Sequence, residues 1–103
     1  MKNERLQVIQ KRIAIIKKEL LTIGEMRPGS LTRQYKDPKN RVGPYYQLSY
    51  THQMKSRTDY VPREALRELR TQIRNYKRFK SLTAEWVSLA IEHSRLQMKL
   101  ARG

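Results

Sequence analysis

A row of basic side chains at helical spacing is the feature of this sequence most suggestive of chemistry. Between residues 63 and 80, seven Lys or Arg residues accompany only two acids, Glu64 and Glu68. Recurrence every three or four residues places such bases along one side of a helix. A guanidinium group donates paired hydrogen bonds to a phosphate, so the row suits a polyanion. The residues expected to contact phosphates are Arg63, Arg67, Arg70, Arg74, Lys77 and Arg78.

A second basic group precedes this helix, and aromatic and amide side chains lie within it. Tyr45 and Gln47 stand between the bases, where a ring can stack on a nucleobase and an amide can pair with an adenine edge. We therefore expect the bases to extend the phosphate contact and Tyr45 and Gln47 to contact nucleobases. The bases concerned are Arg33, Lys39, Arg41, Lys55 and Arg57.

The charge of the whole chain supports a polyanionic partner. The 103 residues include 23 Lys and Arg against 9 Asp and Glu, a formal net charge of +14. The excess is spread along the chain rather than gathered in a tail, so the folded body is basic and attracts nucleic acid or an anionic surface. No apolar run approaches the ~20 residues of a membrane span. We expect no membrane contact and a cytoplasmic location, in the nucleoid or a nucleoprotein complex.

Residues for catalysis or metal binding are sparse. The chain has no Cys, which excludes disulfides and thiolate metal ligands. His52 and His93 have no carboxylate cluster at metal spacing beside them, and Gly29 and Gly43 stand singly rather than in a phosphate loop. We therefore expect no catalytic residue, no metal site, no cofactor and no enzyme activity.

The element at residues 3–23 is predicted to be a helix with a heptad seam. Its apolar residues alternate three- and four-residue steps for nearly three heptads, and Gly24 ends the pattern. The regular spacing predicts a helical partner, either within the chain or in a second copy. The seam consists of Leu6, Ile9, Ile13, Ile16, Leu20 and Ile23.

Residues 28–61 change character and predict a small antiparallel sheet. Three runs of strand-forming residues lie between Pro and Gly residues, at 30–36, 45–51 and 56–61. The last two read most clearly as a hairpin turning at residues 52–55. In the first run Arg33 would lie on the same face of the strand as the apolar residues Leu31 and Tyr35. A charged side chain on that face predicts a bulge or an exposed edge.

Helical character returns at Pro62 and persists to residue 101, with a local overwinding or a joint predicted near residues 78–81. One apolar register runs through Leu66, Leu69, Ile73 and Tyr76, and another begins at Phe79. The first register should pack on the sheet, and the second on the helix at 3–23. The fold class is α+β in a single domain over 1–103, with the terminal helices paired as an antiparallel coiled coil. The second register contains Phe79, Leu82, Trp86, Leu89, His93, Leu96 and Leu100.

Four segments together resemble a family of short bacterial proteins whose domain has no known function. The resemblance covers about residues 26–100. Members often carry paired cysteines before the segment that corresponds to Gly43–Tyr50, and here residues 37–42 contain none. The resemblance implies a bacterial setting near mobile genetic elements, and it supplies no known activity. The segments are Arg27–Leu31, Gly43–Tyr50, Tyr60–Pro62 and Asn75–Phe79.

These features predict a non-catalytic nucleic-acid-binding protein, an accessory subunit of a bacterial nucleoprotein or mobile-element machine. Phosphate contacts do not distinguish DNA from RNA, so both stay open. The alternative is a helical protein–protein interaction module, an adaptor or regulator of a larger enzyme. In that alternative the heptad seams bind a larger protein or a second copy.

Overall fold

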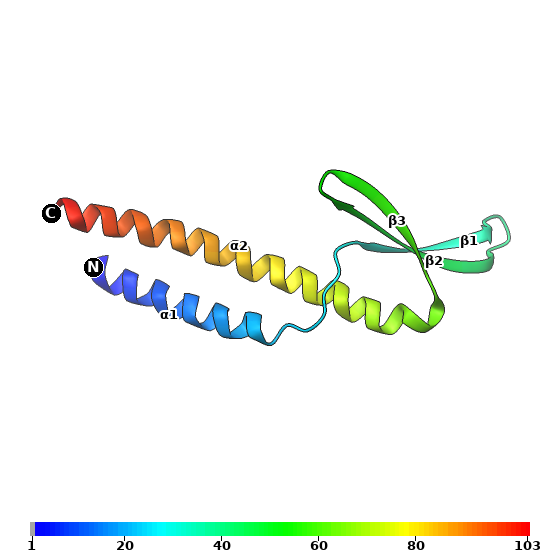
Figure 1. Ribbon diagram of the computed structural model, residues 1–103, viewed down its shortest axis with the longest axis horizontal. Coiled ribbons are helices and arrows are strands. Elements are labelled where there is room, and N and C mark those ends of the chain that lie inside the picture. The colour runs from blue at the N-terminus through cyan, green and yellow to red at the C-terminus, as the bar shows by residue number, and fades with distance from the viewer. Residues whose placement is uncertain (1) are drawn as a thin grey trace. The chain divides into compact units, whose positions relative to one another are not determined.

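The fold consists of two helices and a three-stranded sheet. The computed structural model describes residues 2–103, with side chains from residue 4 onward. The predicted α+β class and the pairing of the terminal helices are confirmed. The elements, in chain order, are α1 (Lys2–Leu21), β1 (Ser30–Asp37), β2 (Val42–His52), β3 (Lys55–Val61), a 3-10 turn (Arg63–Ala65) and α2 (Leu66–Arg102) (Figure 1).

These elements form two compact units that share α2. The helical unit comprises α1 and residues 78–103, and the sheet unit comprises residues 24–77. The helix α2 continues through residues 78–81, where the sequence predicts a joint. The apolar register changes between Tyr76 and Phe79, and the boundary between the units falls at the same place. One helix therefore presents one apolar stripe to the sheet and another to α1.

In the helical unit, α1 and α2 run antiparallel (Figure 1). The predicted seams form the core between them, except that Leu100, near the end of α2, is 42% exposed. Ile9 and Ile16 are fully buried, and Leu82 is 6% exposed. Two ion pairs cross one edge of this hairpin and fix its register. Arg5 Nε lies 2.6 Å from Glu92 Oε2, and Arg12 Nε lies 2.6 Å from Glu85 Oε2.

The sheet is an antiparallel meander in the order β1-β2-β3. The register pairs Leu31 with Leu48 and Tyr46 with Val61 and contains no bulge, so β1 is the predicted exposed edge. The turn at residues 52–55 is also confirmed. Its central residues, Gln53 and Met54, have positive φ angles of 51° and 63°, as a type I′ hairpin turn requires.

One face of the sheet packs on the first half of α2, and Leu48 is central to that core. Leu48 is 1% exposed and clusters with Val61 of β3 and with Leu66, Leu69 and Ile73 of α2. Gly29 lies directly over Leu48 with φ of 138°, and a Cβ there would stand 2.7 Å from Leu48 Cδ1. Only glycine suits this entry to β1.

Replacing the central core residue should destabilise the protein strongly. We expect Leu48→Ala to lower the free energy of unfolding by about 2–5 kcal/mol, because the lost methyl groups leave a cavity in a small core. Urea denaturation followed by circular dichroism measures this loss. Met54→Ala is the control, because Met54 is 98% exposed. Equal effects of the two substitutions would contradict the position of the core.

The two edge ion pairs make the stability of the helical unit depend on pH. Hydrogen bonds from Arg12 lower the pKa of Glu85, and hydrogen bonds from Arg5 lower the pKa of Glu92. A carboxyl whose pKa is lowered in the folded state stabilises it above the unfolded pKa, near 4.5, and loses this contribution as pH falls further.

The melting temperature of an E85Q/E92Q variant should reveal this dependence. Above about pH 5 the native protein should melt at a higher temperature than the variant, and the difference should shrink between pH 4.5 and 3 as the carboxylates are protonated. Thermal melts by circular dichroism across this range measure the difference. A constant difference at every pH would show that the ionised pairs do not stabilise the fold.

Candidate nucleic-acid interface

The basic row begins in the 3-10 turn at Arg63, continues along the first half of α2 and faces solvent. The row consists of Arg63, Arg67, Arg70, Arg74 and Lys77, all exposed. Burial of Leu66, Leu69 and Ile73 against the sheet fixes the rotation of the helix. The basic residues recur at the same three- and four-residue spacing on the neighbouring stripe of the helix. Burial of the apolar stripe therefore directs the basic row toward solvent.

No carboxylate neutralises the basic row. In the part of the chain that the structure describes, none of its five members makes an ion pair. Glu64 and Glu68 are exposed and form no such pair with the row, although the i,i+3 and i,i+4 spacings would permit it. Arg74 Nη2 donates to the Thr71 hydroxyl at 3.1 Å, which leaves its charge available.

The link between α1 and β1 is tied to a different side of α2. The Arg27 amide donates to the Gln72 carbonyl oxygen at 3.1 Å, and Asn75 Nδ2 donates to the Glu25 carbonyl oxygen at 2.8 Å. On a helical wheel Gln72 lies opposite the centre of the basic row. These contacts hold the link in place without covering the row.

Arg27 itself is part of the structure of the sheet unit rather than of the basic surface. Its guanidinium pairs with the Asp59 carboxylate of β3 and lies 4.6 Å from the centre of the Tyr50 ring. Arg33 of β1 lies 5.8 Å and 6.0 Å from the ring centres of Tyr35 and Tyr46. Arg33 remains exposed, and aromatic contacts orient it without removing its charge.

The remaining predicted bases occupy the two hairpin tips. Lys39 and Arg41 lie in the turn between β1 and β2, where Asn40 Nδ2 donates to Asp37 at 2.9 Å. Lys55 and Arg57 lie at the start of β3, beside the other turn. The tips stand at opposite ends of β2, whose 11 residues span about 35 Å. All four side chains are exposed.

The predicted base-contacting residues lie on the sheet face that points away from α2. Tyr45 and Gln47 of β2 alternate with the core residues Tyr46 and Leu48 and are half-buried. The register places Thr32 on one side of Gln47 and Tyr60 on the other. This open sheet face carries no charged side chain along its middle, and consists there of Thr32, Gln34, Tyr45, Gln47, Ser49, Thr51, Thr58 and Tyr60.

From the sequence, only Tyr45 and Gln47 of this face were predicted as contact residues. The continuation of the face across all three strands was not predicted. Tyr60 is 69% exposed, and the Ser49 and Thr58 hydroxyls lie 3.4 Å apart across the β2–β3 pair. The alternation within each strand indicates which residues share a face, and the turn at residues 52–55 sets the pairing. Both signals are present in the sequence, so the register was open to prediction.

Arg78 is the one predicted phosphate contact that belongs to the helical unit. Its Nη1 donates to the Thr22 hydroxyl at 3.2 Å, and its Nη2 lies 3.8 Å from Glu19 Oε2. These contacts direct Arg78 toward the end of α1 instead of along the basic row.

Residues 2–103 show neither a metal-binding cluster nor a membrane-spanning helix. No three His, Asp or Glu side chains gather where they could hold a metal ion. Neither described helix combines the length and apolar character needed to cross a membrane.

The geometry defines a small basic α+β protein, in which a three-stranded meander packs on the first half of a long helix and a short helix pairs with the second half. Residues 3–71 match the family described as a domain of unknown function (DUF6788), and the chain belongs to that family. The match reaches from α1 through the sheet to the first part of α2. No curated protein and no solved structure has significant similarity to the chain.

Proposed function

We propose that this protein binds nucleic acid without catalysing a reaction. The observation that carries this proposal is the exposed basic row, whose five charges follow one helical stripe and have no acidic partner among the residues that the structure describes. Surface bases usually lie among acids that screen them. A row without such partners attracts the phosphate backbone, and release of condensed counterions supplies the free energy of binding.

The length of the row suits a nucleic-acid strand. From Arg63 to Lys77 the row extends about 21 Å along the helix, which equals about six steps of 3.4 Å in a duplex. Four of its five members are Arg, which binds phosphate in a paired geometry that Lys does not offer. Phosphate contacts of this kind position the protein without reading sequence.

The sheet offers a second mode of contact. Its open face is uncharged in the middle, and basic residues stand at both tips. Phosphate contacts at the ends would hold the middle of the face against base edges, where hydroxyl and amide groups read hydrogen-bonding patterns. Gln47 lies on the central strand, between Thr32 and Tyr60, and is the candidate for an adenine contact. Tyr45 is the candidate for stacking.

The proposed setting is a bacterial nucleoprotein or mobile-element complex in which the protein acts as an accessory subunit. The resemblance of four sequence segments to short bacterial proteins supports this setting. An accessory role fits a protein that offers a basic row and an open sheet face for binding. Both histidines have ordinary surroundings, since His52 is exposed at a hairpin tip and His93 Nε2 lies 3.3 Å from Gln10 Nε2.

Removing the central charges of the basic row should weaken binding to every nucleic-acid sequence. We expect an R67Q/R70Q/R74Q variant to bind more weakly to a 20-base-pair duplex at low salt. The plot of log affinity against log salt should become shallower by about 2.7 for duplex DNA, because three phosphate contacts are lost. Fluorescence anisotropy over a salt series measures both quantities, and duplex RNA and single strands complete the set of probes.

A variant with the same loss of charge elsewhere provides the control. K11Q/K18Q/K99Q removes three exposed charges from the helical unit. Its salt slope should stay close to that of the native protein, because net charge without contact changes the slope little. Equal slopes for the two triple variants, or no binding by the native chain to any probe at low salt, would refute the proposed function.

The open sheet face should control sequence preference. We expect Gln47→Ala to reduce discrimination among duplex sequences, at a cost of about 1–3 kcal/mol at one base position, while leaving the salt slope unchanged. Selection from a random duplex library measures the preference of each variant. Thr51→Ala at the edge of the same face is the control. An unchanged library profile for Gln47→Ala would exclude base readout by this residue.

A further inference from the structure

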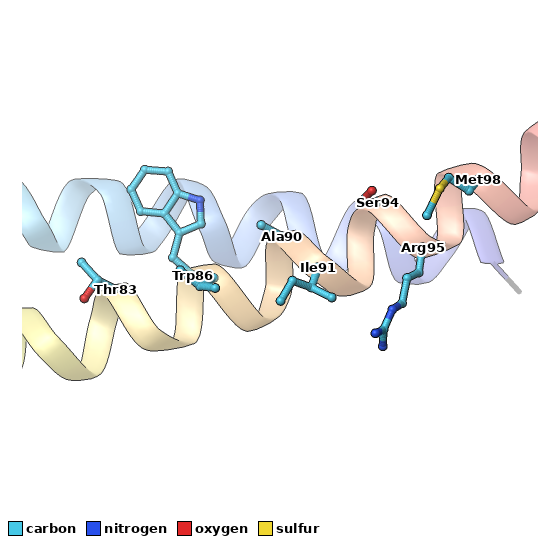
Figure 2. A pocket seen from close by; sticks show the side chains of 8 residues that line it. Thr83, Trp86, Ala90, Ile91, Ser94, Arg95 and Met98 are labelled. Carbon is cyan, nitrogen blue, oxygen red and sulfur yellow. The ribbon is translucent and has the colours of Figure 1, made fainter.

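An apolar surface on the second half of α2 is covered by none of the residues that the structure describes. Val87 is 58% exposed, Ile91 48% and Met98 60%. Together with Trp86 and Ala90 these side chains line a shallow groove (Figure 2). Thr83 and Ser94 continue the same side of the helix, as Figure 2 shows. We call this the apolar groove.

The apolar groove is distinct from the heptad seam that holds α1. Leu82 belongs to the seam and is buried. The groove residues lie on another stripe of α2 at steps of four, three and four residues, and this stripe consists of Thr83, Val87, Ala90 and Ser94. That spacing is itself a helix-packing pattern, rotated from the first. The second half of α2 thus carries two packing stripes, and α1 covers one of them.

The apolar groove continues onto α1. A neighbouring hollow is lined by Ile13, Ala14 and Lys17 of α1 together with Ala90 of α2. Lys17 Nζ lies 5.3 Å from the centre of the Trp86 ring, at the margin between the two hollows. The small side chains of Ala14 and Ala90 allow a third helix to approach both elements closely.

The charged residues that line this surface are basic. They are Lys17 on α1 and Arg95 on α2. The acids Glu85 and Glu92 are held at the ion-paired edge of the hairpin by Arg12 and Arg5. The surface is therefore an apolar strip with positive margins.

We propose that the apolar groove binds an amphipathic helix of a partner protein, whose apolar stripe is flanked by acidic residues. The groove extends about 22 Å from Thr83 to Met98, which accommodates four turns of a helix. Apolar side chains would supply the affinity and the acids would pair with Lys17 and Arg95. This partner site goes beyond nucleic-acid binding, which the sheet unit is proposed to perform.

A second copy of the chain complements this surface poorly. Self-association through the groove would bring the Lys17 and Arg95 margins of one copy against those of the other. The helical unit carries eleven Lys and Arg against four Glu, so its remaining charge repels itself as well. Like charges across an interface oppose association.

Two designed peptides test the proposal. Both are helices of four turns with a Leu stripe, and one carries Glu at the flanking positions where the other carries Lys. We expect the full-length protein to bind the Glu-flanked peptide at least about tenfold more tightly, a difference of 1.4 kcal/mol. Fluorescence anisotropy measures both affinities. Failure to bind the Glu-flanked peptide, or equal affinity for the two, would overturn the proposal.

Variants locate the binding site. V87E/I91E should weaken binding of the Glu-flanked peptide by at least about tenfold. S81E/S88E adds the same charge at exposed positions on another side of α2 and should change affinity by no more than about twofold. Met98→Glu gives a second test of the groove, and helical circular dichroism verifies that each variant folds. Equal losses in V87E/I91E and S81E/S88E would overturn the proposal.

The nucleic-acid function and the partner site are separable. The R67Q/R70Q/R74Q variant should bind the Glu-flanked peptide as the native protein does, whether or not it loses nucleic acid. Loss of the peptide in that variant would show that the acids bind the basic row, and would overturn the proposal. Light scattering measures the oligomeric state of the native protein and the V87E/I91E variant. A native dimer that becomes a monomer in this variant would show that a second copy occupies the groove, and would overturn the proposal.

Discussion

Burial of two different stripes on one helix is the constraint on which the rest of the structure depends. The first stripe of α2, which includes Leu66, Leu69 and Ile73, packs on the sheet, and the second, which includes Leu82, packs on α1. Apolar burial fixes the rotation of each half of the helix, since a stripe that turned away would return to water. This rotation turns the basic row toward solvent in the first half of α2. It also leaves the apolar groove exposed in the second half.

Four of the nine acids of the chain share a role, since they hold structure. Glu85 and Glu92 secure the helical hairpin, Asp59 holds Arg27, and Asp37 shapes the first hairpin turn. These carboxylates are therefore matched to particular bases or amides on neighbouring elements or in a turn. Among the residues that the structure describes, the bases on the row and at the tips have no carboxylate partner. The positive field of the protein is therefore strongest at bases that make no structural ion pair.

The sequence predicted the elements well because their patterns are local. Heptad spacing located α1 and its partner stripe, and strand alternation with the turn at 52–55 located the hairpin. The neutralisation of Arg78 was beyond prediction, since Glu19 and Thr22 meet it only through the antiparallel pairing of the helices. The exposure of Val87 and Ile91 was hidden for a similar reason. Apolar residues beside a seam are expected to be buried as well, because the sequence does not show how much of the helix surface the partner helix covers.

The continuity of α2 couples the two units thermodynamically. A single ladder of hydrogen bonds crosses the boundary between Lys77 and Arg78, and ending a helix within such a ladder forfeits bonds on both sides. Any ligand that binds only the folded sheet unit raises the free energy of unfolding, by about 2.7 kcal/mol at a hundredfold excess over its dissociation constant. Where the two units unfold together, the shared helix would carry part of that gain to the helical unit. Occupancy of the sheet unit would then suppress fraying of the helical unit without a change of shape.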